Sequence, residues 1–446
     1  MNRPHPPLIL SRRGVLAGGL LTAAACSSGT GKGATASRSP SASASARPAV
    51  IRRPNSLPNP HLPAGTDTLP EIDHIVVVMQ ENHSYDNYLG MLRRGDGFTL
   101  DADGHPTAAN RDATGRLVRA FRMPGPCQPQ KQPDQSWTAS QIQLDAGRND
   151  GFVRSQSGTV AMGYWTADDL PFYYGLASTF PLADRYFASV LAQTYPNRRF
   201  LMAGTAYGAI ATSTEGFSEP PPANGTIFNR LNAHGISWKN YYSSLPSTLI
   251  IPSTGKTNAS DLVPIKQFYA DAAAGTLPSV CIVDPDFNHE SEENPENIQL
   301  GEAFSARVIN AVMQGPGWSK TLLIWTYDEG GGYYDHVPPP AAIRPDAIAP
   351  KLAPGMPRGQ YNRYGFRVPT VIVSPLARRD YVSHVVHDHT SILKLVETKW
   401  NLPALTFRDA NASNLLDSLD LKAKPAFLTP PTLPKPALAG GKPATC

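Results

Sequence analysis

Short, continuous runs of apolar residues recur along the chain, and each run ends in a cluster of polar residues. The runs are rich in β-branched side chains. Runs of this kind are typical of strands that are buried on both faces, as in a parallel sheet covered by helices. The predicted strands span residues 75–79, 279–283, 321–325 and 368–373.

Helical patterns lie between the predicted strands. Apolar residues recur at helical spacing over 301–313 and 390–400, and Asp388 is a candidate N-cap for the second helix. The order of strand, polar loop, helix and strand predicts the α/β class, a three-layer sandwich on a mostly parallel sheet. Ligands bind at the carboxyl ends of the strands in such sheets, where we expect the polar clusters to lie. Residues 95–150 and 210–265 are rich in Gly, Pro, Ser and Asn, and we expect them to decorate the sheet and to shape the site.

The N-terminal residues predict export. Arg12-Arg13 precede an apolar run over residues 15–25, which is too short to span a bilayer as a helix and is typical of a signal peptide. The paired arginines favour the twin-arginine export route. Ala-Ala-Ala-Cys26 resembles a bacterial lipoprotein cleavage box in which Cys26 would be lipidated, although Ala23 stands where Leu is usual. Cleavage without lipidation and a buried N-terminal helix are the alternatives.

Composition divides the rest of the chain. Residues 27–70 contain no Phe, Trp or Tyr and are dominated by small and polar residues and Pro. Such a segment cannot bury enough apolar surface to offset its chain entropy, so it is predicted to be a disordered stalk. Aromatic and β-branched residues begin abruptly at Ile72. The sequence therefore predicts an export signal over 1–26, one folded domain over 71–425 and a flexible tail over 426–446.

Charge and cysteines narrow the partners. The net charge of +4 includes three arginines of the leader, so the exported chain would carry +1 and gives no support for nucleic-acid binding through a basic patch. Contact with a membrane is expected only through a lipid on Cys26. An exported protein permits a disulfide, and Cys127–Cys281 is the preferred pair. Cys127, Cys281 and Cys446 leave one cysteine unpaired, however, and the sequence alone does not choose.

Acidic residues directly follow two of the predicted strands. Glu81-Asn82 follows the first, and Asp328-Glu329 follows the third. The carboxyl edge of the sheet would then hold three carboxylates and an amide oxygen, the ligands that hard divalent cations prefer. Three carboxylates that converge without a cation would raise one another's pKa. Each pair could instead only cap a helix or a turn, but the two pairs together favour a metal site.

Five segments resemble, in the same order, the signatures of the bacterial phospholipase C and acid phosphatase phosphoesterase family. The resemblance covers roughly residues 72–405 and implies an alkaline-phosphatase-like core. One motif would be moderate evidence, whereas five in register are strong. The segments are 72–90 (IDHIVVVMQENHSYDNYLG), 194–204 (TYPNRRFLMAG), 327–337 (YDEGGGYYDHV), 364–375 (YGFRVPTVIVSP) and 389–397 (HTSILKLVE).

The resemblance implies a catalytic site. Glu81, Asn82, Asp328 and Glu329 would hold one divalent metal ion of unknown identity, and Thr194 would complete its coordination. A hydroxyl is a poor nucleophile at its free pKa, and metal coordination would activate it. Thr194 would then attack phosphorus and form a covalent phospho-enzyme that water hydrolyses. The alternative for Thr194 is a hydroxyl in an ordinary turn.

Two positions depart from the family. Gln135 and Asn294 stand where histidines are expected to bind the phosphate or protonate the leaving group; neither side chain can serve as a general acid near neutral pH. We assign both, together with Asp335, to substrate binding. His336 is the preferred remaining acid or phosphate contact, with a structural bond to Asp335 as the alternative. His289 could also replace a missing histidine, unless it lies in a solvent-exposed loop.

The remaining candidates are expected to have supporting roles. A surface position is the default for Arg198 or Arg199. His83 is interpreted as a residue behind the metal ligands, and His387 and His389 have the spacing of metal ligands but lie at the start of a predicted helix.

These observations predict an exported, metal-dependent phosphoesterase of the acid phosphatase or phospholipase C type. Its substrate would be a phosphate ester, either a small molecule or a phospholipid. A rival hypothesis, motivated by the two missing histidines, is a catalytically impaired surface lipoprotein that uses the same fold for binding. The oligomeric state is open.

Overall fold

The structure, a computed structural model, describes residues 50–128, 133–214, 217 and 220–438. The chain divides into two units, residues 1–50 and 51–446, and every described helix and strand belongs to the second. The predicted export signal with Cys26 and the stalk up to residue 49 lie outside the described residues. None of the described helices is long and apolar enough to cross a membrane.

One mostly parallel sheet forms the centre of the described domain. Its strand order is β12-β6-β11-β10-β1-β9-β7-β8 among the described residues. Only β11 runs against the other seven of these strands. The strands are β1 (His74–Gln80), β6 (Leu182–Ala183), β7 (Trp238–Tyr242), β8 (Leu262–Pro264), β9 (Val280–Asp284), β10 (Thr321–Tyr327), β11 (Thr370–Val373) and β12 (Val382–Ser383).

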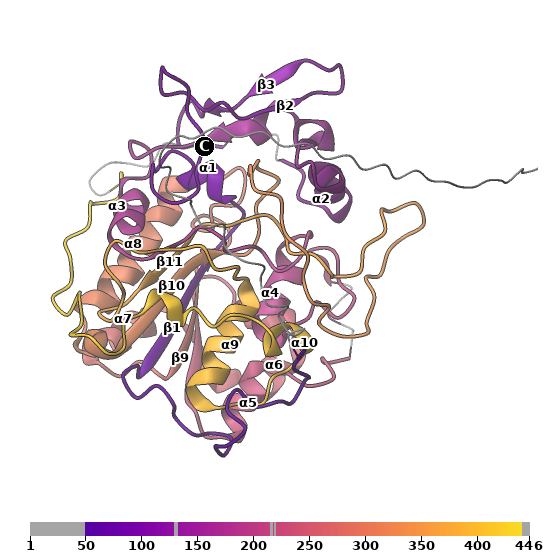
Figure 1. The fold of residues 1–446 in the computed structure, drawn as a ribbon. Helices are drawn as coiled ribbons and strands as arrows, with labels where there is room; N and C mark the ends of the chain where they lie inside the picture. The colour runs from indigo at the N-terminus through magenta and orange to yellow at the C-terminus, as the bar shows by residue number, and fades with distance from the viewer. Residues whose placement is uncertain (1–49, 129–132, 215–216, 218–219, 439–446) are drawn as a thin grey trace, which may run out of the picture. The chain divides into compact units, whose positions relative to one another are not determined.

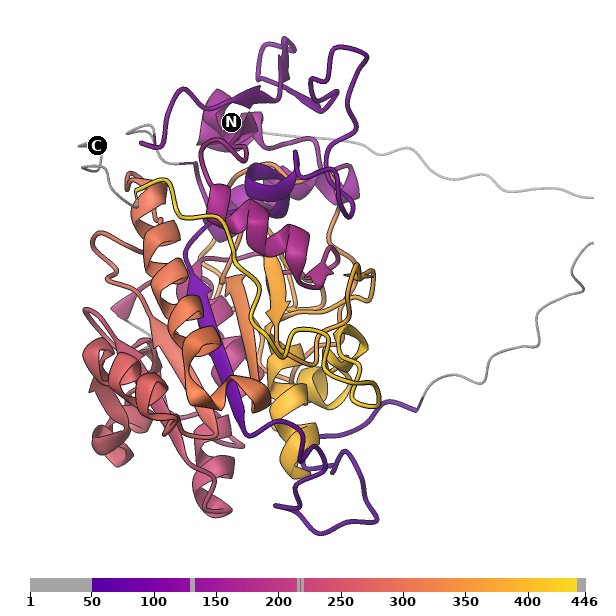
Figure 2. The same cartoon turned by 90° about the vertical axis from the view of Figure 1, so that its left-hand side faces the viewer.

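Helices cover both faces of this sheet. Figure 2 shows α7 and α8 on one side and α9, with its neighbours α4 and α10, on the other. This arrangement confirms the predicted α/β class and its three layers. The helices are α1 (Tyr85–Leu89), α2 (Trp137–Leu144), α3 (Pro171–Thr179), α4 (Thr194–Ala203), α5 (Ile227–Ala233), α6 (Pro252–Thr257), α7 (Ile265–Ala274), α8 (Ile298–Gln314), α9 (His389–Trp400) and α10 (Phe407–Ala410).

Small elements gather above the carboxyl end of β1. Figure 1 shows α1, α2 and the β2–β3 pair at this edge. Two small sheets pair β2 (Ala109–Arg111) with β3 (Leu117–Arg119) and β4 (Phe121–Arg122) with β5 (Gly163–Tyr164).

The register between β1 and β10 positions the site. Gln80 pairs with Tyr327 at the last step of the parallel ladder. The next residues, Glu81 and Asp328, therefore leave the sheet side by side. Both strands are buried along almost their whole length, as their continuous apolar runs predicted.

Two predictions about the sheet were wrong. Residues 210–265 do more than decorate it, because β7 and β8 belong to the sheet and β8 is its edge strand on one side. Their mixed aromatic and polar sequences lack the continuous apolar run that marks a central strand. Ser374 follows β11, which is antiparallel, so this polar cluster lies at the opposite edge from the others.

The predicted boundary between stalk and domain is also too late. Within residues 50–70, the backbone of Gly65 donates to Trp400 O over 2.9 Å, and Asp67 pairs with Lys399 at 2.8 Å. The side-chain amide of Asn401 donates to three carbonyls of this segment. The prediction from composition was wrong here because bonds through backbone carbonyls and one carboxylate, rather than buried aromatic side chains, hold the segment against the rest of the domain.

The predicted flexible tail begins with a buried anchor. Phe427 is 5% exposed, and its ring lies 4.8 Å from that of Phe180. Its carbonyl accepts a 2.9 Å bond from Trp318 Nε1. The tail continues along the domain to Ala437, whose backbone donates to Glu302 over 3.2 Å. The prediction of a loose segment from residue 426 was therefore wrong as far as Ala437.

The preferred disulfide is excluded. Cys281 is a free, buried thiol inside β9, and its Sγ contacts Pro278 O, before the start of the strand. Cys127 is disulfide-bonded and pairs by backbone with Asn297, just before α8. The Cys127–Cys281 prediction was wrong because the two residues lie towards opposite ends of the sheet.

Substituting Phe427 tests whether the C-terminal segment belongs to the folded domain. We expect Phe427→Ala to lower the free energy of unfolding by about 3 kcal/mol, because it leaves a cavity among buried aromatic rings. Leu428→Ala is the control, since Leu428 is 49% exposed and should change stability by less than about 0.5 kcal/mol. Urea unfolding measures both. Equal, small effects of the two substitutions would contradict the docking of this segment.

Candidate active site

The five residues expected to form the metal and nucleophile site lie at the same edge of the sheet. Thr194 is the first residue of α4, and its Oγ1 donates to Asn82 Oδ1 over 3.4 Å. Glu81 and Asn82 directly follow β1, and Asp328 and Glu329 directly follow β10. All five are buried. The structure therefore brings together residues that are up to 248 positions apart in the sequence.

The turn after β1 has a conformation that only some residues adopt. Asn82 has a φ of 81°, in the left-handed region, where Asn is better tolerated than most residues. Its carbonyl packs against Gly331, where an added Cβ would lie 1.9 Å from that oxygen. Glycine at 331 thus lets the turns after β1 and β10 approach each other closely.

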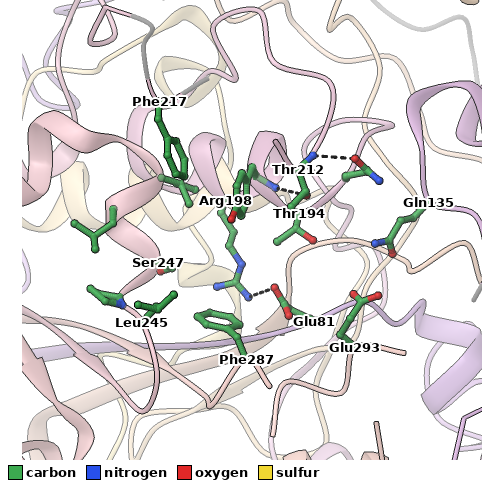
Figure 3. A pocket seen from close by; sticks show the side chains of 15 residues that line it. Glu81, Gln135, Thr194, Arg198, Thr212, Phe217, Leu245, Ser247, Phe287 and Glu293 are labelled. Carbon is green, nitrogen blue, oxygen red and sulfur yellow. Dashed lines mark hydrogen bonds and ion pairs between the residues drawn. The ribbon is translucent and has the colours of Figure 1, made fainter. Parts of the chain in front are cut away.

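A cavity of about 580 Å³ opens in front of Thr194. Figure 3 shows Gln135 and Glu293 on the same side of it as Thr194, and Phe217 and Leu245 on the far side. The cavity thus has a polar end and an apolar end. Its lining consists of Glu81, Gln135, Gln193, Thr194, Tyr195, Arg198, Thr212, Phe217, Leu245, Pro246, Ser247, Leu249, Ile250, Phe287 and Glu293.

Arg198 is the cation of this site, and the expectation of a surface position was wrong. It lies one helical turn after Thr194 in α4 and is 2% exposed. Its Nε donates to Asp328 Oδ2 over 2.8 Å, and its guanidinium lies 3.7 Å from Glu81 Oε1. A third carboxylate, Asp284, lies 3.5 Å away. Arg199 is buried as well. Arg198 is buried because the helix packs this side chain against the carboxylates at the sheet edge, whereas Arg199 donates to Ile250 O over 3.3 Å and lies over the Tyr207 ring.

The carboxylates outnumber this single cation. Burial raises the pKa of Asp328 to about 6 although Arg198 opposes the rise. Burial also raises the pKa of Glu81 and of Glu329, and the charge of Asp328 adds to both effects. Glu329 Oε1 is buried and has no hydrogen-bond partner among the described residues. An oxygen-rich, undercompensated site of this kind fits a divalent cation.

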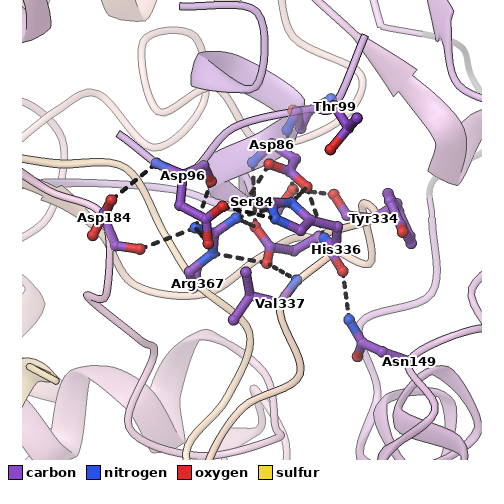
Figure 4. A network of polar contacts seen from close by, with 12 residues as sticks. Ser84, Asp86, Asp96, Thr99, Asn149, Asp184, Tyr334, His336, Val337 and Arg367 are labelled. Atoms are coloured by element: carbon purple, nitrogen blue, oxygen red, sulfur yellow. Dashed lines mark hydrogen bonds and ion pairs between the residues drawn. The ribbon is translucent and has the colours of Figure 1, made fainter. Parts of the chain in front are cut away.

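In a second acidic cluster, the candidate ligand atoms lie closer together than those of the cluster at Glu81. Among the described residues, Asp86, Asp335 and His336 form the one group whose candidate ligand atoms all lie within 4.8 Å of one another. Arg367 is already paired with it, since Nε lies 2.9 Å from Asp335 Oδ1 and Nη2 lies 3.2 Å from Asp86 Oδ1 (Figure 4). The guanidinium compensates these buried carboxylates. We therefore favour a structural ion-pair network here and the metal site at Glu81.

The structure corrects the roles of His336 and Asp335. Neither lines the cavity. His336 Nδ1 lies 2.7 Å from Asp86 Oδ2, and the carboxylate of Asp335 accepts from Arg367. The assignment of His336 to acid catalysis and of Asp335 to substrate binding was wrong, because Asp86 and Arg367 hold both side chains in the network. The alternative for His336 was a structural bond to Asp335, and it was also wrong, because His336 bonds to Asp86.

Of the two positions that replace family histidines, one reaches the cavity. Gln135 lines it and forms a side-chain hydrogen bond with Glu293. Asn294 does not line it, because its Nδ2 donates to Tyr333 Oη over 2.9 Å. The assignment of Asn294 to substrate binding was therefore wrong, and its neighbour Glu293 takes that place on the wall. The sequence signal for Glu293 was its position beside Asn294 in a segment already marked as departing from the family.

His289 is not a substitute for a missing histidine. Its side chain is 73% exposed and pairs with Asp286 at 3.1 Å, as the alternative of a loop histidine predicted. His83 is buried behind the site, with Nδ1 2.6 Å from Asn87 Oδ1. His389 Nε2 donates to Asp328 O over 2.7 Å and so supports the turn after β10.

The chain is similar to proteins of one family. The profile of the Phosphoesterase family matches residues 72–403. Phospholipase C B of Mycobacterium tuberculosis is 29% identical over 430 residues, covering 83% of this chain and 80% of that protein. Non-specific phospholipase C4 of Arabidopsis thaliana is 30% identical over 411 residues, covering 82% and 74%. Among solved structures, a protein in the alkaline phosphatase superfamily from Vibrio parahaemolyticus aligns with a TM-score of 0.36 at 12% identity, covering 74% and 77%.

The network around Arg367 makes stability depend on pH. Burial lowers the pKa of His336, but the hydrogen bond to Asp86 and its charge outweigh this and raise it to about 9, above the ordinary value of 6.5. The stability that His336 adds is therefore complete below about pH 6.5 and is lost as the pH rises through about 9. We expect the difference in unfolding free energy between the native chain and His336→Gln to shrink over this range. A constant difference between pH 5 and 10 would contradict the network.

Proposed function

The chain belongs to the phosphoesterase family, and on that premise we propose that it hydrolyses phosphate esters through a covalent intermediate on Thr194. The family match confirms the resemblance predicted from the five segments. The chain is thus a hydrolase that acts on phosphoric ester bonds. The observation that carries the nucleophile is the place of Thr194, at the start of α4, bonded to Asn82 and open to the cavity.

The metal would be held by the oxygen atoms of Glu81, Asn82, Thr194, Asp328 and Glu329. A divalent cation supplies two things at such a site: it favours the alkoxide of a bound hydroxyl and withdraws charge from the phosphoryl oxygens. The unpartnered Oε1 of Glu329 and the excess of carboxylates over Arg198 support this assignment.

Thr194 is placed to attack a phosphoryl group in the cavity. Its Oγ1, having given its proton to solvent, forms the bond to phosphorus while the bond from phosphorus to the leaving oxygen breaks and that oxygen takes a proton. Water then attacks phosphorus, so that phosphate is released and Thr194 regains its hydroxyl proton. Arg198 pairs with Asp328 and Glu81 and so offsets part of the negative charge beside the reacting phosphate.

Glu293 is our candidate for the proton donor that the absent histidines would otherwise supply. It lies on the cavity wall with Thr194, and Gln135 hydrogen-bonds to its side chain. Burial, assisted by the charge of Asp328, raises the pKa of Glu293 to about 8, so it carries a proton at neutral pH. An alkoxide leaving group needs such a proton as it departs.

The apolar end of the cavity supports an ester with an apolar alcohol. Phe217, Leu245 and Leu249 line it and are 37%, 65% and 39% exposed, although burial would be favourable for each. A substrate whose alcohol is an acyl glycerol or another apolar group would cover them. The relatives are phospholipases C by name, which favours a phospholipid over a small monoester. The N-terminal leader supports action after export, either secreted or anchored through Cys26.

Thr194 variants test the nucleophile. We expect Thr194→Ala to lower kcat by about 10³-fold or more, because Thr194 is the cavity hydroxyl that bonds to the predicted metal ligand Asn82. Thr194→Ser should keep measurable activity. Hydrolysis of p-nitrophenyl phosphate, p-nitrophenyl phosphorylcholine and phosphatidylcholine would be measured with chelator and after return of Mg²⁺, Mn²⁺, Ca²⁺ or Zn²⁺. The exposed Thr257→Ala is the control.

The outcomes separate the parts of the proposal. An unchanged rate in Thr194→Ala would remove the nucleophile assignment, and a rate indifferent to chelator would remove the metal. No hydrolysis of any substrate by the native chain would leave the rival hypothesis of a binding lipoprotein.

Leaving groups of different basicity test Glu293. We expect Glu293→Gln to lower kcat about 100-fold for alkyl esters, whose alkoxides need a proton, and less than 10-fold for p-nitrophenyl esters. Native activity on alkyl esters should fall as the pH rises through about 8, where Glu293 loses its proton. Glu290→Gln is the control, because Glu290 is in the same loop but pairs with Arg307 outside the cavity. Equal losses for both ester types would contradict the role of proton donor.

A further inference from the structure

Glu292 and Glu293 are neighbours in the loop that follows β9, yet their side chains point in opposite directions. Glu293 lines the cavity, whereas Glu292 is 0% exposed and points into the protein. Glu292 has a φ of 73°, a left-handed conformation that a residue with a side chain keeps only where its surroundings enforce it. The reason for this backbone conformation lies in what the buried carboxylate contacts.

Three tyrosine hydroxyls donate to the carboxylate of Glu292. Tyr173 donates to Oε1 over 2.5 Å, and Tyr88 and Tyr327 donate to Oε2 over 2.5 and 2.7 Å. No Lys or Arg contacts the side chain of Glu292 among the described residues. Burial raises the pKa of Glu292 to about 8, and the three tyrosine hydroxyls oppose this rise. They therefore offset part of the cost of burying this side chain.

Two of the three tyrosines lie close in the chain to the predicted metal ligands. Tyr327 is the last residue of β10, directly before Asp328, and Tyr88 lies in α1, shortly after Asn82. The loop also bonds to the end of β1 through its backbone, since Glu81 N donates to Ser291 O over 2.9 Å. One buried carboxylate thus ties the β9 loop to the segments that hold the metal ligands.

The packing leaves room for this carboxylate and little else. A Cβ added at Gly301 of α8 would lie 2.2 Å from Glu292 Cγ. On the backbone side, Glu292 O accepts a 2.7 Å bond from Gln128 Nε2, and Glu292 N donates to Glu296 Oε2 over 2.9 Å. Both the side chain and the backbone of Glu292 are therefore fixed, and the direction of the next side chain follows from them.

We propose that Glu292 is a positioning residue for the reaction: its anchor on the three tyrosines holds Glu293 on the cavity wall opposite the apolar end. The inference rests on the proposed function of Glu293. Glu292 itself touches neither the cavity nor the predicted metal ligands through its side chain. Its effect on catalysis must therefore pass through Glu293 and disappear when Glu293 is already replaced.

Two substitutions at Glu292 separate position from charge. Glu292→Gln keeps one carbonyl oxygen for Tyr88 and Tyr327, and its amide can face Tyr173, whose hydroxyl also reaches Ser305 Oγ at 3.0 Å. We expect this variant to keep kcat/KM for alkyl esters within about 3-fold of the native value. Glu292→Ala removes the anchor and should lower kcat/KM for alkyl esters by about 10-fold or more, with a smaller effect on p-nitrophenyl esters.

A double-mutant cycle distinguishes positioning from a loss of stability. In the Glu293→Gln background, Glu292→Ala should change kcat/KM by less than about 2-fold. Asp417→Ala is the matched control, because Asp417 is a hydrogen-bonded carboxylate away from the cavity. It should lower the unfolding midpoint and leave kcat/KM unchanged. If Glu292→Ala does not fold, Tyr173→Phe takes its place in the cycle, because this substitution removes one of the three donors.

Hydrogen exchange measures the anchor without using activity. We expect amides of residues 285–297 to exchange faster in Glu292→Ala than in the native chain, and to exchange at the native rate in Asp417→Ala. Unchanged exchange, or equal losses of kcat/KM in the native and Glu293→Gln backgrounds, would overturn the inference while the proposed function stands. A native chain that hydrolyses no ester would overturn the proposed function and the positioning role with it, whatever the exchange shows.

Discussion

The structure depends on the parallel register between β1 and β10. Gln80 and Tyr327 end their strands at the same level, so two acidic pairs that are far apart in the sequence leave the sheet next to each other. That juxtaposition creates a charge problem, because buried carboxylates repel and lose their hydration. Arg198, delivered by the same helix that begins with Thr194, offsets part of it. The remaining deficit of positive charge supports the proposal that this edge binds a cation and, through it, an anionic substrate.

The surroundings of the buried carboxylates differ between three places in this protein. Around Arg367, a guanidinium compensates Asp86 and Asp335, and the result is a closed network without access to the cavity. At Glu292, tyrosine hydroxyls compensate a carboxylate without any cation. At the ends of β1 and β10, beside the cavity, compensation is incomplete, as the unpartnered oxygen of Glu329 indicates. Incomplete compensation at an open cavity is what distinguishes a reactive site from structural ion pairs of similar composition.

The class of fold and the acidic half of the site could be predicted because both depend on local patterns. Continuous β-branched runs identify buried strands wherever they pack, and an acidic pair directly after such a strand must lie at its carboxyl end. The histidine and arginine roles could not be predicted in this way. The sequence favours His336 over His289 as the acid, but His336 is held by Asp86 and His289 is exposed to solvent. Arg198 was expected at the surface because charged residues are rarely buried without partners, and its partners come from β1, β9 and β10.

The sequence by itself determined the α/β class, the strands that bear Glu81 and Asp328, the place of Thr194 in a recognisable motif, and membership in a family. Each of these is encoded within a few consecutive residues, so no long-range contact is needed to read it. The tertiary structure decided that Glu293, rather than its neighbour Asn294, faces the cavity. It also decided that Gln135 is the hydrogen-bond partner of Glu293. It also decided that residues 50–70 and Phe427 belong to the domain. Those outcomes depend on contacts between segments hundreds of residues apart, where backbone hydrogen bonds and side-chain directions, rather than composition, determine the result.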